Sequence, residues 1–539
     1  MPCSLRTHRP LIMGQNGAVA TNHPQATAVG IDILRSGGNA FDAAVAVSLT
    51  LGVVEPAMSG LGGDGFYHVW LAKSGKTVVY NGSGAAPEAA CKDRFTKTGI
   101  PISGPLSTST PGLVGGLSAL HLNHGTQSWS HLCNTAADVA KSGFFVTHAY
   151  RAFAESNLQK LNTNDVSKRI FTDGGTVPSL GAKITQPLLA STLTQLGDEG
   201  AEGFYRGALA KRICNDAKSS GMMLTDADFA TFHPEIQNSI STTYRGFEIF
   251  QTPLNSTGFV LLEELKILEQ FDIKNFDYGS AELIHLMVEI KKRAFRDREC
   301  YGTDPRYTDF DIQTLLTKDY ASEQAETIDL QTSSDIPLLP HHQKSGDTTY
   351  FCVIDKDGNA VSAIQSINSA FGSGVTGSGT GILFNNRMAY WHLKNEHPNM
   401  LQPSKRVRHT MNAPIITKNG KLWSVFGTPG ADNQVQINFQ IAVALMDYGF
   451  DPQQAVEVAR WTSSQPNQAA NWPHGGDHSL TLERGVSDDV LKGLAQRGHD
   501  VKTVAPLAGP CSVACIRLLD NGTRMAGSDP RRDGWAAAY

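Results

Sequence analysis

The sequence lacks the continuous runs that mark several common classes of protein. No stretch of the 539 residues approaches the roughly 18 apolar residues of a membrane span, and residues 1–24 contain no apolar core of a secretory signal. Lysine and arginine form no long run, and the net charge of −5 argues against a nucleic-acid-binding surface. We therefore expect a cytoplasmic protein that binds neither a membrane nor nucleic acid.

Cysteine pairs and phosphate-binding motifs are also missing. The eight cysteines include no CxxC, and the closest two, Cys511 and Cys515, have no histidine cluster beside them, so we predict no metal site. Scattered cysteines of this kind are typical of buried, reduced thiols in the cytoplasm. The glycine-rich stretch 59–65 lacks the Gly-Lys-Ser/Thr ending of a nucleotide loop, and we interpret it as a tight turn against neighbouring backbone.

The composition and patterning that are present indicate a large globular protein. Hydrophobic residues make up 40% of the chain and charged residues 18%, which is enough apolar material for a large core. Helical patterns at 24–36 and 40–51 precede a mainly helical region from about 130 to 330, and strand patterns dominate after residue 348. Sheets with helices outside them favour an α/β sandwich.

One long helical pattern, 281–298, carries a cluster of basic residues near its C-terminal end. Its apolar residues, Leu283 and Ile290 among them, face inward at helical spacing. Positive charge is favourable near a helix C-terminus, so we interpret the basic cluster as a solvated face. Its members are Lys291, Lys292, Arg293, Arg296 and Arg298.

Two hydroxyl side chains, Thr348 and Thr349, stand where a loop-like segment gives way to a strand. The strand pattern 350–354 and the turn residues 357–359 predict a hairpin whose second strand is 360–364. One interpretation of two hydroxyls at the start of a buried hairpin is that Thr348 becomes a new N-terminus by self-cleavage and then acts as a nucleophile. This stretch taken alone favours the alternative, a strand edge that begins with two β-branched residues.

An ordered series of motifs surrounds this junction. GGNAFDAAVAVSLTLGVVEPAMSGLGGDGF (37–66) lies at the front, GDTTYFCVIDKDGNAVS (346–362) at the junction, and FGSGVTGSGTGILFNN (371–386), GTPGADNQ (427–434) and GSDPRRDGWA (527–536) follow. Over essentially the whole chain this series resembles the gamma-glutamyltransferase family of N-terminal-nucleophile hydrolases. The resemblance implies a four-layer αββα sandwich.

The resemblance also implies that a precursor cleaves itself between Asp347 and Thr348. The products would be a large subunit, 1–347, and a small subunit, 348–539, which together form one structural body. The freed α-amine of Thr348, with a pKa of about 8, would serve as the base for its own hydroxyl. No cofactor or metal is implied, and a dimer of processed heterodimers stays open.

The same resemblance assigns roles to several residues after the junction. Thr349 lines the site, Ser366 takes the place of a threonine that hydrogen-bonds the nucleophile, and Asn368 matches a substrate-contacting asparagine. Gly430 and Ala431 stand where backbone N–H groups form the oxyanion hole, and losing one such donor costs about 3–4 kcal/mol of barrier.

Five positions depart from the γ-glutamyl-recognising members of the family. Ser83 replaces an arginine that binds the α-carboxylate, and a neutral hydroxyl cannot substitute for a guanidinium. Arg387 and Tyr390 replace the residues for the α-amino group, and His409 and Thr410 replace a serine pair. The pattern His-Thr-Met-Asn (409–412) with Gly-Thr-Pro-Gly-Ala-Asp (427–432) is more similar to the acylase and small-amide branch. If Arg387 and His409 face the pocket, the substrate carries an anionic group; the alternative is that Arg387 forms a surface ion pair.

The sequence therefore predicts a self-processing amidohydrolase that cleaves a small-molecule amide through a threonyl acyl-enzyme, mainly by hydrolysis. The alternatives are a true gamma-glutamyltransferase or glutathione hydrolase, an oxamate-type small-amide hydrolase, and a scaffold homologue that does not process itself. Because the residues for chemistry are present, the enzyme is favoured over the scaffold.

Overall fold

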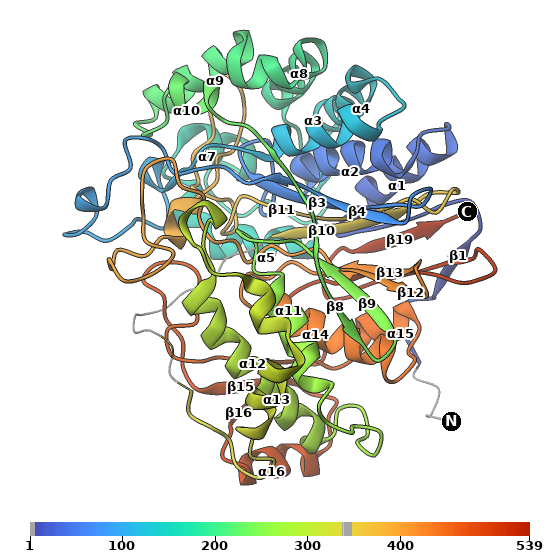
Figure 1. The fold of residues 1–539 in the computed structure, drawn as a ribbon. Coiled ribbons are helices and arrows are strands. Elements are labelled where there is room, and N and C mark those ends of the chain that lie inside the picture. The colour runs from blue at the N-terminus through green and yellow to red at the C-terminus, as the bar shows by residue number, and fades with distance from the viewer. Residues whose placement is uncertain (1–5, 337, 339–347) are drawn as a thin grey trace.

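Two large β-sheets lie face to face at the centre of the molecule, with helices above and below them (Figure 1). The computed structural model describes residues 6–336, 338 and 348–539. Asp347, the predicted residue on the amino side of the cleaved bond, lies outside the described residues.

The first sheet has seven strands and contains the hairpin that follows Thr348. Its order is β19 (Trp535–Ala538), β2 (Ala18–Thr21), β10 (Thr349–Ile354), β11 (Ala360–Ser366), β3 (Asp64–Leu71), β4 (Lys76–Gly82) and β7 (Glu235–Gln237). Every neighbouring pair is antiparallel. The predicted hairpin is thus confirmed, and it occupies the middle of the sheet.

The second sheet also has seven strands and covers the inner face of the first. Its order is β1 (Ile12–Gly14), β18 (Arg524–Ser528), β17 (Ala514–Leu518), β13 (Lys421–Gly427), β12 (Ile415–Lys418), β9 (Phe247–Gln251) and β8 (Ile240–Tyr244). Alternate side chains of the two sheets, such as Phe66, Tyr350 and Val425, form one apolar layer between them. Such alternation is what a face-to-face packing of sheets requires.

Helices cover both outer faces, as Figure 1 shows. On the first sheet lie α1 (Pro24–Arg35), α2 (Ala40–Val54) and α3 (Leu113–His124), and α4 (Trp129–Ser142) and α8 (Pro187–Arg206) pack against α2 and α3. On the second lie α11 (Phe259–Leu268), α14 (Asn433–Met446) and α15 (Pro452–Glu457), and α12 (Ala281–Tyr301) packs against α11. The α2 helix is nearly all buried because its alanines and valines allow layers to pack on both sides. The predicted αββα sandwich is confirmed.

Smaller elements complete the fold at its edges. The helices are α5 (His148–Ser156), α6 (Leu158–Leu161), α7 (Asp165–Phe171), α9 (Ala208–Ser219), α10 (Asp226–Ala230), α13 (Lys318–Glu326) and α16 (Asp488–Gln496), and the strands are β5 (Phe144–Phe145), β6 (Lys183–Ile184), β14 (Trp461–Ser463), β15 (Ser479–Glu483) and β16 (Asp500–Val504). Only β15 and β16 pair in parallel among the described strands. In the same part of the chain, no helix is both long and apolar enough to cross a membrane.

Strands from both sides of the junction alternate within each sheet. β10 and β11 insert between β2 and β3, and β12 pairs with β9, so the chain before and after Thr348 shares one core. Separating them would expose the apolar layer on both sides. This interleaving supports one structural body, while the subunit boundary itself stays a prediction.

Close backbone contacts hold the glycine-rich turn before β3. A Cβ on Gly62 would overlap with the carbonyl of Leu383, and one on Gly63 would overlap with the carbonyl of Ser366. The carbonyl of Gly63 also accepts the N–H of Gly112 at 2.9 Å. The interpretation as a tight turn is confirmed, because only glycine leaves room for backbone at this distance.

The basic cluster of α12 is not a solvated face, so that prediction was wrong. Lys291, Arg293 and Arg298 are at most 3% exposed. Lys291 Nζ donates to the carbonyl of Ser463 at 3.0 Å, and Arg298 pairs with Asp432 at 2.6 Å. A second layer, which includes β14, covers the side of α12 that a solvated helix would expose, and it supplies the partners that buried charges need.

Candidate active site

Thr348 lies at the start of the central hairpin and is only 2% exposed. Because Thr349 is paired with Gln365, Thr348 falls beside Ser366 at the end of β11. The Oγ1 atom of Thr348 lies 3.5 Å from Oγ of Ser366, and Ser366 Oγ accepts the backbone N–H of Asn368 at 2.7 Å. The structure therefore brings the predicted nucleophile next to its predicted hydroxyl partner.

Thr349 turns to the opposite side and contacts a carboxyl group. Its Oγ1 donates to Oε2 of Glu55 at 2.6 Å and accepts from Nδ2 of Asn22 at 3.3 Å. Burial raises the pKa of Glu55 to about 7, and the hydrogen bond from Thr349 opposes this shift. A carboxyl group with a pKa near neutrality therefore contacts Thr349, the residue that directly follows the predicted nucleophile.

The stability of the protein is expected to depend on Glu55 between pH 4.5 and 7. Its pKa rises from 4.5 to about 7 on folding, so the folded state keeps a proton that the unfolded chain has lost. The free energy of unfolding should therefore fall as the pH rises through this window. In Glu55→Gln, which keeps an acceptor for Thr349, urea unfolding at pH 4.5 and 7.5 should show a smaller difference than in the parent chain. An unchanged difference would contradict the assignment.

The predicted oxyanion loop joins β13 to α14 through two left-handed residues. Gly430 has φ 125° and Ala431 has φ 48°. A Cβ on Gly430 would overlap with Sγ of Cys511. Ala431 is buried, and its φ is unfavourable for a residue that has a Cβ. Asp432, which follows, accepts the N–H of Ala470 at 2.8 Å and pairs with Arg298, so the loop is held from behind.

Gln434 is a contact of Thr348 to which the sequence assigned no role. Its side chain is fully buried, and its amide lies 3.3 Å from Oγ1 of Thr348. In the orientation that satisfies both ends of the amide, Nε2 donates to the carbonyl of Thr410 at 2.9 Å. Its Oε1 then accepts from Oγ1 of Thr348 and from the N–H of Ala431, both at 3.3 Å.

Arg387 is buried, so the alternative of a surface ion pair was wrong. It is 1% exposed, its Nε lies 3.2 Å from Oδ2 of Asp64, and its guanidinium covers the ring of Tyr390 at 4.7 Å. Nη2 of Arg387 has no hydrogen-bond partner among the described residues. Burial raises the pKa of Asp64 to about 6, and the charge of Arg387 opposes the rise.

His409 lies beside this buried pair. Its ring meets that of Phe66 edge-on at 5.3 Å, and neither ring nitrogen has a hydrogen-bond partner within the described part of the chain. Burial, together with the charges of Arg387 and Arg406, holds the pKa of His409 well below its usual range. The imidazole is therefore neutral at pH 7 and keeps one donor and one acceptor for another molecule.

The remaining substrate-binding candidates already have protein partners. Ser83 Oγ donates to Oδ1 of Asn81 at 2.7 Å, and Tyr390 and Thr410 share a hydrogen bond of 3.0 Å. Asn368 has φ 80° and donates to the carbonyl of Asn386 at 3.0 Å, which leaves its Oδ1 unpaired among the described residues. Direct substrate contact by these residues stays a prediction.

Three residues at the site, Glu55, Asp64 and Gln434, received no role from the sequence. All three lie inside motifs that had been singled out, in EPAMSGLGGDGF and GTPGADNQ. Their signal was a lone polar side chain within a run of small or apolar residues. Their partners are Thr349, Arg387 and Thr348, which lie 86 to 323 positions away in the chain, so spacing could not identify the pairs.

Two groups of side chains could be considered for a metal ion within the described residues. They are His285, Glu289 and His499, and Glu299, His392 and His397. In the first, Nδ1 of His285 and Nε2 of His499 are hydrogen-bonded to each other at 2.8 Å. In the second, the rings of His392 and His397 stack at 3.4 Å and 4°, so their in-plane lone pairs cannot converge on one ion. Each carboxylate is also paired with a basic side chain, and we assign no metal to either group.

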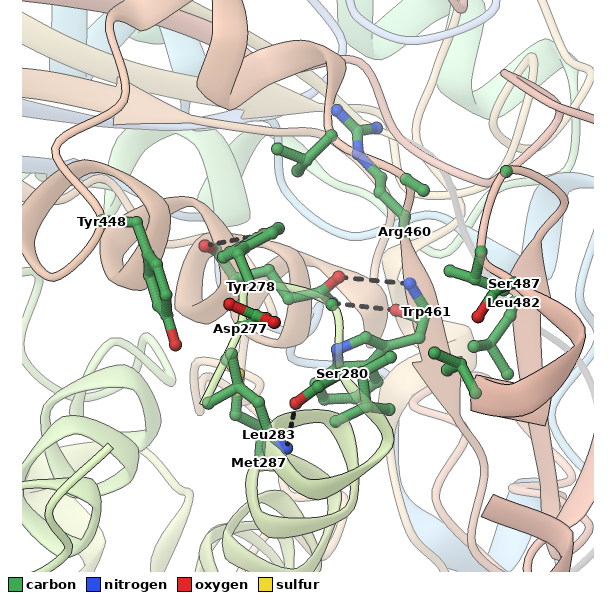
Figure 2. Close-up of a pocket in the computed structure, with 18 of the residues that line it drawn as sticks. Asp277, Tyr278, Ser280, Leu283, Met287, Tyr448, Arg460, Trp461, Leu482 and Ser487 are labelled. Atoms are coloured by element: carbon green, nitrogen blue, oxygen red, sulfur yellow. Dashed lines mark hydrogen bonds between the residues drawn. The ribbon is translucent and has the colours of Figure 1, made fainter. Parts of the chain in front are cut away.

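A cavity of about 620 Å³ opens elsewhere in the molecule (Figure 2). Tyr278, Tyr448, Trp461 and Leu482 contribute to its mostly apolar wall, while Arg460 directs its guanidinium toward Asp529. None of the predicted site residues lines this cavity. Its size suits a small molecule, but it is separate from the chemistry at Thr348.

The αββα sandwich with a threonine at the head of a central strand defines the class of N-terminal-nucleophile hydrolases. The family model for gamma-glutamyltranspeptidase matches residues 26–539. A glutathione hydrolase-like YwrD proenzyme of Bacillus subtilis (strain 168) is 37% identical over 531 residues, which are 97% of this chain and 99% of the relative. An oxamate amidohydrolase proenzyme of Klebsiella pneumoniae is 31% identical over 532 residues, or 97% and 98% of the two chains.

The crystal structure of a cephalosporin acylase from Bacillus halodurans is similar over the whole fold. Its TM-score is 0.90 at 31% identity, and the match covers 100% of this chain and 98% of that one. The chain therefore belongs to the gamma-glutamyltranspeptidase family. It is an enzyme that acts on C–N amide bonds. Its similarity to acylases agrees with the acylase and small-amide branch that the sequence predicted.

Proposed function

We propose that Thr348 first cleaves its own chain and then hydrolyses a small amide that carries an anionic acyl group. The observation that carries the proposal is the position of Thr348 Oγ1, which lies between Ser366 and the oxyanion loop at the head of β10. The resemblance of the junction motif GDTTYFCVIDKDGNAVS (346–362) to the family supports the same role for Thr348.

Self-cleavage needs no other molecule than water. Oγ1 attacks the carbonyl carbon of residue 347, the C–N bond breaks as the amine of Thr348 takes a proton, and an ester replaces the peptide bond. Water then hydrolyses the ester and leaves a free carboxylate on one subunit and a free α-amine on the other. The freed amine, with a pKa of about 8, is the base that the hydroxyl of Thr348 requires.

In turnover the same atoms act on a second amide bond. The α-amine takes the proton of Oγ1 as Oγ1 attacks the substrate carbonyl, and N–H groups of the oxyanion loop stabilise the developing charge. The amine of the substrate leaves with a proton, and an acyl ester stays on Thr348. Water releases the acid. Hydrolysis is expected to exceed transfer, because no acceptor-binding site is identified near the loop.

The polar atoms around Arg387 support an anionic group on the acyl side. Nη2 of Arg387 and both ring nitrogens of His409 lie buried without partners within the described residues. Leaving buried donors unpaired costs about 1–3 kcal/mol each, and a substrate carboxylate would accept from Nη2 of Arg387 and from the single ring N–H of the neutral His409. Ser83 is bound to Asn81 and offers no charge, so γ-glutamate would lose its usual partner here.

A panel of amides tests the proposal as a whole. Glutathione, a γ-glutamyl anilide, a glutaryl anilide, a neutral acetyl anilide and oxamate should be incubated with the purified protein, and released amine or ammonia measured. Fastest turnover of the glutaryl anilide supports the proposal, and fastest turnover of glutathione supports a glutathione hydrolase instead. Oxamate as the best substrate favours the small-amide alternative. An uncut chain that turns over nothing supports the scaffold.

The substrate charge is tested by removing the buried pair together. Arg387→Met/Asp64→Asn eliminates both charges, which avoids leaving Asp64 buried and unpaired. The ratio of kcat/KM for the glutaryl anilide to that for the acetyl anilide should fall about 10- to 100-fold, as expected for a lost hydrogen bond to a charged group. Asp64→Asn alone is the control and should keep the preference. Equal losses on both anilides would remove the anionic-substrate assignment.

Two further parts of the proposal concern the whole protein. We infer a cytoplasmic location from the sequence, while a single processed heterodimer and a dimer of heterodimers both stay open. Cell fractionation and light scattering of the processed protein measure them directly.

A further inference from the structure

Gln434 links the nucleophile to the oxyanion loop. We propose that its amide oxygen occupies the oxyanion position in the resting enzyme and that Gln434 is the positioning residue of this site. The inference deepens the proposed function and rests on it, because it concerns the same threonine. It identifies the amide oxygen of Gln434 as the hydrogen-bond acceptor that a substrate carbonyl oxygen must displace.

The geometry of one atom carries the inference. Oε1 of Gln434 accepts from Oγ1 of Thr348 and from the N–H of Ala431, each at 3.3 Å. A substrate carbonyl oxygen needs the same N–H, and its carbon must lie next to the same Oγ1. Oε1 therefore stands in the place of the carbonyl oxygen, within reach of both groups that will act on it.

The other end of the amide fixes this position. Nε2 of Gln434 donates to the carbonyl of Thr410 at 2.9 Å, and the side chain is fully buried at the first turn of α14. Held at one end, the amide keeps the hydroxyl of Thr348 and the N–H of Ala431 directed toward one point. A long contact of 3.3 Å is also weak enough for a substrate oxygen to displace it.

Charge at this atom should control the reaction. In Gln434→Glu a carboxylate would face the oxyanion as it forms, and the shape of the side chain would hardly change. At pH 8 we expect kcat to fall about 100-fold, the size of losing an oxyanion contact. As the pH falls the carboxyl becomes neutral, and the ratio of variant to parent kcat should rise toward one. Expressing activity as this ratio reduces the contribution of the α-amine titration, and a carboxylate that raised the pKa of the amine would lower the ratio at pH 8 in the same direction.

The rate of self-cleavage is a second measurement, and we expect it to change with pH in the same direction as the relative kcat. The precursor of Gln434→Glu should process slowly at pH 8 and faster at pH 5, relative to the parent at each pH. Gln434→Met, which has no charge, should lose activity without gaining this acid-dependent recovery. A denaturing gel and the anilide assay are sufficient to compare the parent, Gln434→Glu and Gln434→Met.

Gln440 provides the matched control, since it is a buried amide on the same helix. It bonds with the backbone of Gln436 and Trp461, and its contacts do not include Thr348. Gln440→Glu should change stability and leave the pH dependence of relative kcat unaltered. The inference is overturned if Gln434→Glu follows the parent pH profile, or if Gln440→Glu gains the same recovery. Failure of the parent itself to process or turn over would instead reject the proposed function.

Discussion

Replacing Thr348 with alanine is expected to leave the chain uncut and inactive. The purified parent should give bands of roughly 37 and 21 kDa, the shares of 58.0 kDa that residues 1–347 and 348–539 carry. Thr348→Ala should give one band of 58.0 kDa, because no hydroxyl is left to attack the preceding carbonyl. Anilide turnover should fall by about 10⁴-fold or more, as for other enzymes that lose their nucleophile. Intact-mass measurement and the anilide assay check both results.

The control for this variant is Thr348→Ser, which keeps the hydroxyl and loses one methyl group. It should process and turn over more slowly than the parent but far above Thr348→Ala. A residual cut in Thr348→Ala at the same bond would assign the cleavage to another group or to a contaminating protease. Ser366→Ala separates these cases. Loss of the Ser366 hydroxyl should slow self-cleavage while the cleaved bond stays the same.

The sequence predicted the layers and the hairpin because these depend on local pattern. The alternation in 350–354, the turn 357–359 and the Ala-Val helix 40–51 each specify an element with little help from the rest of the chain. Once β10 and β11 pair, the register places Thr348 beside Ser366 without further information. The geometry at the nucleophile was therefore accessible from a short segment.

Long-range pairing explains what was missed. Arg387 was assigned equally to the pocket or to the surface because its partner, Asp64, lies 323 positions earlier in the chain. The basic cluster of α12 was placed in solvent because Asp432 and Ser463, which bind Arg298 and Lys291, come from the far end of the sequence. Charge pattern alone does not distinguish a solvated helix face from one that a later segment covers.

These buried contacts connect the back of α12 to the catalytic loop. Arg298 joins Asp432, and Asp432 follows directly after Ala431, so the oxyanion loop is fixed by a buried ion pair. A rigid loop is what electrostatic stabilisation of an oxyanion requires, because donors that must reorient contribute less. If the loop supplies the oxyanion donors as proposed, the buried Arg298–Asp432 pair contributes to catalysis as well as to the core.

Replacing Gly430 with alanine should therefore reduce kcat about 1,000-fold while the helices and sheets remain. The new Cβ would overlap with Sγ of Cys511, and φ 125° is a conformation that alanine rarely adopts, so the backbone must turn its N–H away. KM should change little, since the proposed substrate contact at Arg387 lies outside this loop. Steady-state kinetics with the anilide and a far-UV circular dichroism spectrum measure the two parts of this result.

Ala431→Gly is the matched control one residue along the same loop. Ala431 has φ 48°, so glycine relieves strain there, and the N–H that bonds with Gln434 is unchanged. We expect a kcat at or above that of the parent. If Gly430→Ala keeps the parent kcat, the loop does not supply the oxyanion donors. If both variants lose activity to the same extent, the loop tolerates neither substitution, and the φ angles of Gly430 and Ala431 do not explain the loss.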